Sequence, residues 1–281
     1  MVKKFAVIGH PISHTMSPFI HTRLFGLRNI DVEYLTLDIE PEQLAGEISG
    51  CLAPLTGYNV TIPHKENIIP HLNEIHESAK KYNAVNCVIN KDGRLYGYST
   101  DAYGFTRALE SAGVKLSGRV LVLGAGGAAR TLAREAADNG CDITIAVRES
   151  DYEKANQLKG WLVENGGKAN VKLLNDITGE FDLCINATPV GMYPNTDAAV
   201  LTEEQLSHCK ALFDAVYNPE RTKLIRMAEN LGIKAVGGMA MLVWQAAKAH
   251  EYWYGAVFTV NEIEEIIAAA NKEMERIFYA K

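Results

Sequence analysis

The sequence contains no apolar run approaching the roughly 20 residues that a membrane-spanning helix requires. We therefore expect no transmembrane segment and no membrane partner. The N-terminal residues 1–9 begin with a basic stretch, but the apolar run that follows is too short for a signal peptide. We expect a first β-strand there instead.

Cysteine is scarce and shows no pattern, since its number is odd and no Cys-x-x-Cys pair occurs. This excludes a disulfide framework and favours free thiols in the reducing cytoplasm. The eight histidines have no ligand spacing, so we expect no bound metal. The five cysteines are Cys51, Cys87, Cys141, Cys184 and Cys209.

Positive charge is not in excess either, because the formal net charge is -6. This balance argues against nucleic acid or an anionic membrane as the main partner. It leaves an anionic small-molecule substrate open, because a pocket sets its own local field. Repeats and low-complexity tracts are also absent. With 281 residues, 47% of them hydrophobic, the chain can form two modest globular domains or one large one.

Short β-rich runs alternate with helical patterns, which favours an α/β fold with largely parallel sheets. In the first hundred residues we expect strands over 5–8, 33–37 and 57–61, and helices over 18–27 and 41–52. Later strands are expected over 120–123, 142–147, 182–186, 212–215 and 234–236. Later helices are expected over 104–111, 131–139, 240–254 and 261–278.

The pattern resets near residues 111–118, where a helix ends at Gly113 and a loop leads into a buried strand. We therefore expect residues 1–103 to form an N-terminal α/β domain. Residues 104–238 are expected to form a Rossmann-type, doubly wound nucleotide-binding domain. The C-terminal helices, residues 239–281, are expected to return to the first domain and complete it.

A glycine-rich segment follows the apolar strand 120–123 and opens a helix. Gly124 permits the tight turn, Gly126 lets a pyrophosphate approach the backbone, and Ala129 allows close packing of helix on strand. The free N–H groups and positive dipole end of the helix would face the phosphates. In this context the segment predicts dinucleotide binding, whereas a turn used only for packing is the alternative.

The end of the second strand of this βαβ unit bears on which nucleotide is bound. An acidic residue there would hold the ribose 2′-hydroxyl of NAD, and an arginine would favour the 2′-phosphate of NADP. The chain has Arg148 followed by Glu149, so the two signals conflict unless Glu149 turns to solvent. We favour NADP, and a solvated surface pair of these residues remains open.

Polar residues gather in loops of the first hundred positions. Thr15 and Ser17 precede a helix and could cradle a carboxylate, although Ser17 could equally act as a simple N-cap. Lys65 falls in the first turn of a helix that begins at Pro63, where the dipole disfavours a cation. A lysine in this position is either a surface residue or one with a function. Asn86, like Asp101, is expected in a strand-end loop.

Taken together, the motifs of these segments and their order resemble the shikimate dehydrogenase family from end to end. The motifs are Gly-x-Pro-Ile-x-His-x-x-Ser-Pro at 9–18, Asn-Val-Thr-Ile-Pro-x-Lys at 59–65, Ala-Val-Asn at 84–86, Thr-Asp at 100–101, Gly-Ala-Gly-Gly-Ala at 124–128, Asn-Ala-Thr-Pro-x-Gly-Met at 186–192, Asp-x-x-Tyr-Asn-Pro at 214–219 and Met-Leu-Val-x-Gln-Ala at 241–246.

The resemblance implies a reversible, NADPH-dependent reduction of 3-dehydroshikimate to shikimate, within the shikimate pathway of aromatic amino-acid (chorismate) biosynthesis. It assigns proton transfer at the reacting oxygen to Lys65, with Asp101 beside it, and leaves open which of them holds the proton at each step. Substrate binding is assigned to Thr15, Ser17, Asn59, Thr61, Asn86, Thr100, Tyr217 and Gln245. Nucleotide binding is assigned to Gly124, Gly126, Gly127, Ala128, Ala129, Arg148, Thr188, Ala215 and Gly238.

Three positions depart from the family pattern. Thr15 stands where serine is usual, Ser99 where asparagine is usual, and residues 147–149 replace an Asn-Arg-Thr-like stretch. Two alternatives therefore stay open: a quinate/shikimate dehydrogenase that uses NAD, and a non-catalytic sensor of metabolite and nucleotide. The intact pair of Lys65 and Asp101 argues against the sensor. The expected assembly is a monomer or a homodimer.

Overall fold

The computed structural model describes residues 2–12 and 15–279, so positions 13 and 14 of the 9–18 motif lie outside the described residues. The chain divides into two compact units. The first comprises Met1–Gly104 and Val243–Ala270, and the second comprises Phe105–Leu242 and Asn271–Lys281. Residues 239–242 and 271–281 thus group with the second unit, whereas all of 239–281 was expected to complete the first. The roles assigned to the two domains stay predictions.

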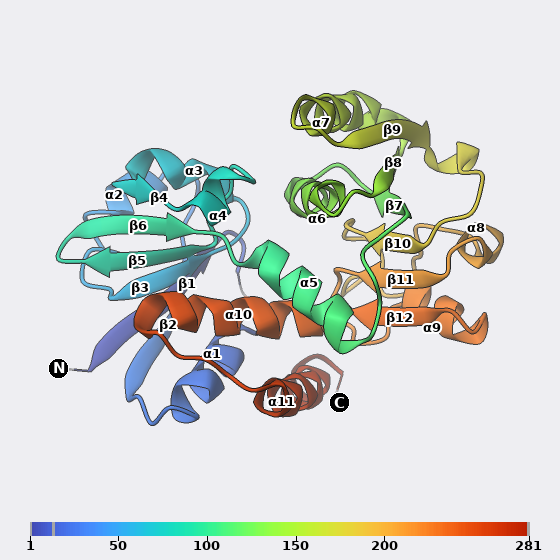
Figure 1. Ribbon diagram of the computed structural model, residues 1–281. Helices are drawn as coiled ribbons and strands as arrows, with labels where there is room; N and C mark the ends of the chain where they lie inside the picture. Colours follow the sequence, from blue (N-terminus) through green and yellow to red (C-terminus); the bar gives the residue numbers. More distant parts are fainter. Residues whose placement is uncertain (1, 13–14, 280–281) are drawn as a thin grey trace. The chain divides into compact units, whose positions relative to one another are not determined.

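The first unit contains a six-stranded mixed sheet in the order β2-β1-β3-β5-β6-β4 (Figure 1). Its strands are β1 (Lys3–Gly9), β2 (Val32–Asp38), β3 (Gly57–Val60), β4 (Glu74–Ile75), β5 (Cys87–Lys91) and β6 (Arg94–Tyr98). Strand β1 pairs in parallel with β2 and β3, and β4 does so with β6, whereas β5 is antiparallel to β3 and β6. Three of these five pairings are parallel, so the expectation of largely parallel sheets is confirmed, with β5 as the antiparallel exception in this unit.

The antiparallel pair β5–β6 is a hairpin that was not predicted, although its turn residues are typical of one. Its turn contains Asp92 and Gly93, with φ of 52° and 81°. Positive φ at two consecutive turn residues matches the right-handed twist of the flanking strands, and Asp-Gly is a preferred pair for such a turn. The hairpin reverses the chain just before the segment that carries Thr100 and Asp101.

Short helices connect the strands of the first unit: α1 (Ser17–Gly26), α2 (Leu44–Glu47), α3 (His64–Asn67) and α4 (Glu77–Lys80), with a 3₁₀ turn η1 (Ile69–His71). The helix expected over residues 41–52 is wrong in length, since only α2 forms. Gly46 and Gly50 weaken a helix in this stretch because glycine loses the most backbone freedom on ordering. Leu44 and Leu52 are nevertheless buried and hold the segment on the core.

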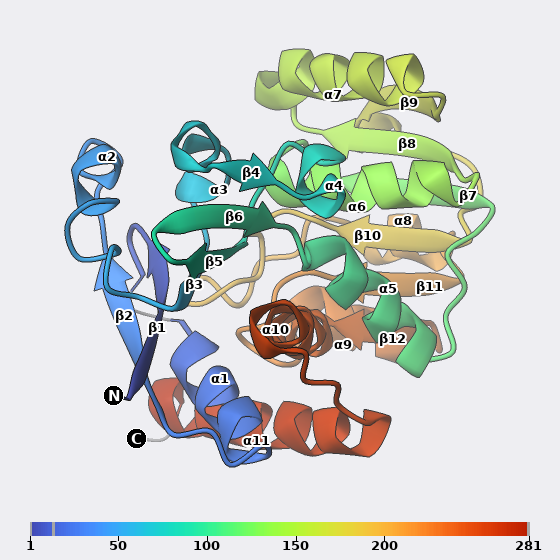
Figure 2. The same ribbon diagram turned by 60° about the vertical axis from the view of Figure 1, so that its left-hand side comes forward.

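The second unit contains an all-parallel sheet in the order β12-β11-β10-β7-β8-β9 (Figure 2). Its strands are β7 (Arg119–Leu123), β8 (Asp142–Val147), β9 (Lys168–Leu173), β10 (Leu183–Asn186), β11 (Ala211–Asp214) and β12 (Lys234–Gly237). Counted from β7, this is the strand order of the dinucleotide-binding Rossmann fold. The strand order reverses between β7 and β10, which is where such folds bind their ligands. The predicted doubly wound fold is confirmed.

Helices cover both faces of this sheet. Helices α6 (Gly127–Asp138) and α7 (Tyr152–Glu164) lie on one face, and α8 (Glu203–Ser207) and α9 (Lys223–Asn230) lie on the other (Figure 1). Two 3₁₀ turns, η2 (Glu149–Asp151) and η3 (Leu174–Asp176), follow β8 and β9. Three helices contribute residues to both units: α5 (Asp101–Ser111), α10 (Gly238–Tyr254) and α11 (Val260–Phe278).

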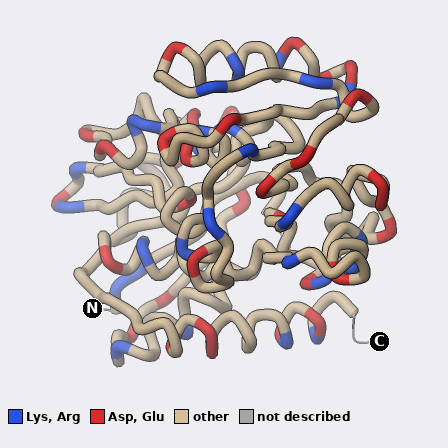
Figure 3. Tube along the Cα trace, turned by 45° about the vertical axis from the view of Figure 1, so that its right-hand side comes forward, with Lys and Arg blue, Asp and Glu red and all other residues tan. Residues whose placement is uncertain are grey.

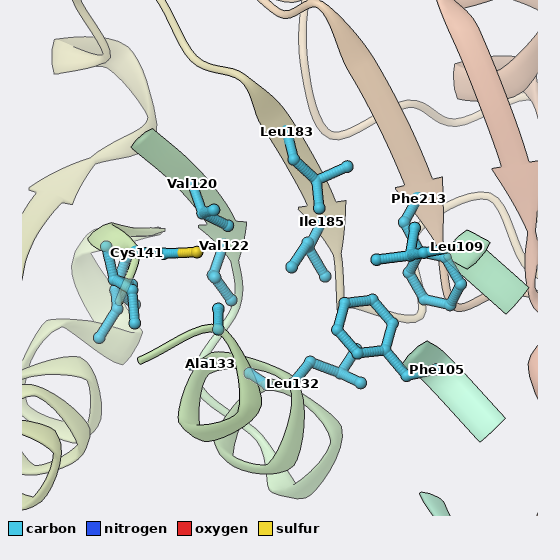
Figure 4. Packing of buried hydrophobic residues seen from close by; sticks show 14 of the residues in the cluster. Phe105, Leu109, Val120, Val122, Leu132, Ala133, Cys141, Leu183, Ile185 and Phe213 are labelled. Atoms are coloured by element: carbon cyan, nitrogen blue, oxygen red, sulfur yellow. The ribbon is translucent and has the colours of Figure 1, made fainter. Parts of the chain in front are cut away.

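The core of the second unit explains the continuous apolar run of its first strand. Val120 and Val122 of β7 point to the face covered by α6, where they pack with Leu132 (Figure 4). Leu121 and Leu123 point to the opposite face and belong to a second buried cluster. A strand buried on both faces needs apolar residues at every position, which is typical of parallel sheets.

Charged residues are distributed along the whole chain. Figure 3 shows Lys and Arg interspersed with Asp and Glu on the helices and loops. Within residues 2–12 and 15–279, none of the helices combines the length and the apolar character that crossing a bilayer requires.

Two histidines form a buried pair in the first unit. Nδ1 of His21 in α1 lies 2.9 Å from Nε2 of His250 in α10, and both side chains are fully buried. The His21 ring stacks on that of Tyr34, and Nδ1 of His250 contacts the Tyr254 hydroxyl. Burial lowers the pKa of His21 to about 3 and holds the pKa of His250 well below its ordinary value. Both rings are therefore neutral in the folded protein at neutral pH.

We expect this pair to make the protein sensitive to acid. Below about pH 6.5 the unfolded chain binds protons on these histidines, while the folded chain does not. The contribution of the neutral pair to the free energy of unfolding is therefore fully present above that pH and decreases as the pH falls toward 3. In that window each histidine lowers the free energy of unfolding by up to about 1.4 kcal/mol per pH unit. Urea unfolding at about pH 7.5 and about pH 5.0 should show this loss, and His21→Gln should reduce it.

The matched control for this prediction is His208→Gln. His208 is half-exposed, so the same substitution there reports the effect of replacing a histidine that is not buried. Equal pH dependence in the wild type and in His21→Gln would contradict the prediction.

Candidate active site

Lys65 and Asp101 lie in contact although 36 residues separate them in the sequence. Lys65 is on α3 and Asp101 begins α5, and the distance from Lys65 Nζ to Asp101 Oδ2 is 2.5 Å. The Lys65 side chain is 30% exposed and that of Asp101 is 12% exposed. The ammonium therefore has one carboxylate partner and an open side from which a ligand oxygen can approach.

Asn86 holds this pair in place from the residue before β5. Its side-chain amide nitrogen lies 2.8 Å from Asp101 Oδ1, 2.9 Å from Thr100 Oγ1 and 3.1 Å from Gln245 Oε1, all within hydrogen-bond distance. The backbone N–H of Thr100 donates to Asn86 Oδ1 at 2.8 Å. Asn86, Thr100, Asp101 and Gln245 are all buried, so this network is rigid and shielded from water. The structure thus brings four of the predicted site residues together around Lys65.

Asn59 and Thr61 lie at the end of β3, beside this network. The Tyr34 hydroxyl donates to Asn59 Oδ1 at 2.7 Å, and Asn59 Nδ2 donates to the Asn86 carbonyl at 3.3 Å. The Asn59 amide is therefore buried and engaged within the protein. Its predicted contact with substrate stays a prediction, as does that of Thr61. The supporting role of Tyr34 had no local signal in the sequence, because β2 and β3 reach each other only through the sheet.

Thr15 and Ser17 meet at the start of α1. Thr15 Oγ1 accepts a hydrogen bond from the Ser17 backbone N–H at 3.1 Å. Met16, rather than Ser17, occupies the N-cap position, and no side chain caps the helix. The alternative that Ser17 serves as a simple N-cap is therefore wrong. The Ser17 residue is buried at this helix start.

The second unit has a pocket of about 450 Å³ at the point where the strand order reverses. Gly124 has φ of +100°, and a Cβ there would lie 2.9 Å from Thr188 Cγ2, so the turn requires glycine. No atom lies within 4 Å of a Cβ built on Gly126 or Gly127, which leaves open space above the start of α6. Four of the predicted nucleotide-binding residues line the pocket: Gly124, Gly126, Arg148 and Thr188.

The other predicted nucleotide-binding residues have different surroundings. Gly127 and Ala128 are exposed in the first turn of α6. Ala129 is fully buried in the core, as its expected packing role requires. Gly238 lies against the backbone at Ala215, where an added Cβ would approach the carbonyl oxygen to 2.4 Å. The nucleotide contacts of these residues stay predictions.

A buried carboxylate, that of Asp214, is linked through Asn186 to Thr188, which lines the pocket. Asp214 at the end of β11 accepts hydrogen bonds from Thr222 Oγ1 at 2.6 Å, Asn186 Nδ2 at 2.9 Å and the Val216 N–H at 3.1 Å. Asn186 Oδ1 in turn accepts a bond from Thr188 Oγ1 at 2.7 Å. Burial raises the pKa of Asp214 to about 6. Asp214 was noted in the sequence only as part of a motif, and its supporting role required the neighbouring strand.

Arg148 and Glu149 line different depressions of the surface. Arg148 lines the nucleotide pocket, while Glu149 lines a separate depression with Tyr152. Glu149 is therefore not among the residues that line the nucleotide pocket. Two further charged residues, Asp151 and Lys154, line that pocket and were missed in the sequence.

These features fit a dinucleotide. Open space over Gly126 and Gly127 admits a pyrophosphate, and the N-terminus of α6 has no side-chain cap that would compete for its N–H groups. Arg148 directly follows β8, the strand end at which this fold favours an arginine when the nucleotide is NADP. Among the described residues, no group of three or more His, Cys, Asp or Glu side chains is arranged to hold a metal ion.

Tyr217 is the one predicted substrate-binding residue of the second unit. Its ring is partly buried, and burial raises the pKa of its hydroxyl. Asn218, the next residue, is buried, and its side-chain oxygen accepts a hydrogen bond from the Tyr279 hydroxyl at 2.8 Å. A contact between Tyr217 and the substrate carboxylate stays a prediction.

An α/β unit with a lysine–carboxylate pair and a Rossmann unit with a dinucleotide pocket define a dehydrogenase of the two-domain type. Residues 7–88 match the family model of the shikimate dehydrogenase substrate binding domain. The NADP(+)-dependent shikimate dehydrogenase of Clostridium perfringens strain 13 is 40% identical over 268 residues, which cover 94% of this chain and 97% of the relative. The chain belongs to the shikimate dehydrogenase family.

Two solved structures of the family are similar throughout. A shikimate dehydrogenase in complex with NADP+ has a TM-score of 0.88 and 35% identity, with 95% of each chain covered. The enzyme of Thermus thermophilus in complex with NADP(H) and shikimate has a TM-score of 0.85 and 34% identity. That match covers 96% of this chain and all of the other.

Proposed function

We propose that the protein is an NADP-dependent shikimate dehydrogenase, which interconverts 3-dehydroshikimate and shikimate in the pathway to the aromatic amino acids. The observation that carries this proposal is the contact of Lys65 with Asp101 inside the Asn86 network. Relatives over nearly the whole chain are named as NADP(+)-dependent shikimate dehydrogenases, and one was solved with NADP(H) and shikimate bound.

Lys65 and Asp101 would carry out the proton transfer. NADPH, when bound, supplies the hydride that adds to the carbonyl carbon of the substrate. Lys65 Nζ would hydrogen-bond to the carbonyl oxygen and stabilise the negative charge that develops there as hydride arrives. The pair would deliver a proton to this oxygen, completing the hydroxyl, and would remove it in the reverse reaction. General acid–base action of this kind contributes roughly 10²–10⁴-fold to a rate.

The remaining polar residues would orient the substrate. The Thr15 and Ser17 hydroxyls, at the start of α1, suit a carboxylate, because hydroxyl groups and helix N-termini both donate to anions. Thr61, Asn86 and Gln245 would bind the ring hydroxyls. Because the Asn86 network is already formed in the protein, little ordering would remain when substrate binds.

The pocket of the second unit would hold the nucleotide. Backbone N–H groups around Gly126 would donate to the pyrophosphate, and the guanidinium of Arg148 would pair with the 2′-phosphate of NADP. Since Glu149 does not line this pocket, the acidic residue that favoured NAD in the sequence is not placed to contact the nucleotide there. This supports NADP as the preferred nucleotide.

We further propose that the enzyme acts in the cytoplasm, as a monomer or a homodimer. All five cysteines are free thiols, and four of them are buried. This is the state that a reducing compartment maintains.

Steady-state rates with two acids and two nucleotides test the proposed function. We expect kcat/KM to be highest for shikimate with NADP+, and lower by about tenfold or more for quinate or for NAD+. NAD+ lacks the 2′-phosphate that would pair with Arg148, and quinate would fit the polar groups around the ring less well. A preference for quinate with NAD+ would favour the alternative enzyme. Binding of both ligands without any change in the absorbance of reduced nicotinamide would instead identify a sensor.

A further inference from the structure

The turn after β8 places an ion pair inside the nucleotide pocket. Nε and Nη2 of Arg148 both donate to Oδ2 of Asp151, at 3.0 and 2.8 Å, and both residues line the pocket. Arg148 is the residue available to pair with a 2′-phosphate. In the free protein its guanidinium therefore already has an anionic partner.

The Asp151 carboxylate binds Arg148 in the pocket and does not cap the helix α7 that it precedes. It occupies the N-cap position of α7, where an aspartate ordinarily accepts a hydrogen bond from a backbone N–H of the first turn. No such bond forms, and the carboxylate is directed to Arg148 instead. The backbone of the turn supports this arrangement, because the Asp151 N–H donates to the Arg148 carbonyl at 3.0 Å.

From this arrangement we infer that Asp151 is a specificity-determining residue that weakens the preference for NADP over NAD, an inference that rests on the proposed function. A 2′-phosphate must take Arg148 from Asp151 and then lie beside a carboxylate of the same charge. The 2′-hydroxyl of NAD can instead donate a hydrogen bond to that carboxylate. The pocket thus accepts both nucleotides, with Asp151 opposing one and assisting the other.

The exposure of the pair shows which of these effects is larger. The Arg148 side chain is 74% exposed and that of Asp151 is 39% exposed, and ion pairs in water are held weakly. Arg148 therefore changes partner readily. The main effect is repulsion between the carboxylate and the phosphate, which salt screens. Lys154 lines the same pocket and stays available to either anion.

Nucleotide dissociation constants test this inference without reference to activity. Calorimetric titration of the purified full chain with NADP+ and with NAD+ would compare the wild type with Asp151→Asn. We expect Asp151→Asn to bind NADP+ about five- to tenfold more tightly and NAD+ no more tightly than the wild type, with a smaller gain at high salt.

Glu149→Gln is the matched control. This substitution also removes one negative charge, two residues away from Asp151, but Glu149 lies outside the nucleotide pocket. The ratio of the dissociation constants for NADP+ and NAD+ should therefore stay within about twofold of the wild-type ratio. If both variants changed NADP+ affinity equally, the effect would come from the net charge of the protein and not from the position of Asp151, and the inference would be overturned. Weaker NADP+ binding by Asp151→Asn would also overturn it, since Asp151 would then pre-position Arg148. Failure of the wild type to bind either nucleotide would instead refute the proposed function.

Discussion

Replacing Lys65 with alanine is expected to lower kcat for shikimate oxidation by about three orders of magnitude. The ammonium that contacts Asp101 at 2.5 Å is the one cation on this network within the described residues. Without this ammonium, no hydrogen-bond donor stabilises the negative charge on the reacting oxygen. Asp101 is then the one group of the pair that can exchange a proton with that oxygen. KM should change little, because the interaction is strongest in the transition state. Steady-state kinetics with saturating NADP+ would measure both constants.

Lys80→Ala is the control for this prediction. Lys80 is an exposed lysine of the same unit, paired with Glu77 one helical turn away, so its removal should leave kcat unchanged. If Lys65→Ala retained the wild-type kcat, the assigned mechanism would be refuted. A rise in KM with constant kcat would instead make Lys65 a residue that only binds substrate.

Asn86→Ala should impair both catalysis and stability. Its side chain holds Asp101, Thr100 and Gln245, and it accepts the buried Thr100 N–H. Truncation leaves that donor unsatisfied, so we expect the free energy of unfolding to fall by about 2–3 kcal/mol. We expect kcat to fall by about 10², because Asp101 loses the donor that orients it. Urea unfolding and steady-state kinetics would measure the two effects.

Asn156→Ala provides the comparison for stability. The Asn156 side chain is partly exposed on α7 and, among the described residues, donates to the Tyr152 carbonyl within its own helix, so its loss should change the free energy of unfolding by no more than about 0.5 kcal/mol. A variant Asn86→Ala with normal kcat and lowered stability would show that the network is structural only. Normal values of both would refute the description of Asn86 as its centre.

The Rossmann unit could be predicted from sequence because its signals are local. The apolar strand 120–123, the glycine turn and the following helix are consecutive, and each restricts the next. The strand expected over 142–147 is β8 residue for residue. The helix expected over 41–52 was too long, because two glycines in that stretch oppose the helix that its apolar pattern predicts. The hairpin β5–β6 was missed although Asp92-Gly93 marked its turn.

The site was predicted in part for the same reason. Lys65, Asn86 and Asp101 sit in short motifs that stand out in the sequence, and the structure brings them into contact. Tyr34 and Asp214 were not identified, because each acts through a residue on another strand of its sheet: Asn59, two strands from Tyr34, and Asn186, on the strand next to Asp214. Such pairings depend on sheet register, which no local pattern of residues reports.

By itself, the sequence determined the fold class and the glycine turn, and its resemblance to a family indicated Lys65 and Asp101 as the proposed acid–base pair. Hydrophobic periodicity and turn chemistry depend on neighbouring residues, and a lysine or a carboxylate carries its chemistry wherever it lies. Only the tertiary structure decided that Glu149 lies outside the pocket of the second unit while Asp151 lines it, and that the Asn86 side chain contacts both α5 and α10. These outcomes depend on side-chain directions and on contacts between residues far apart in the chain, which form only when the strands and helices pack.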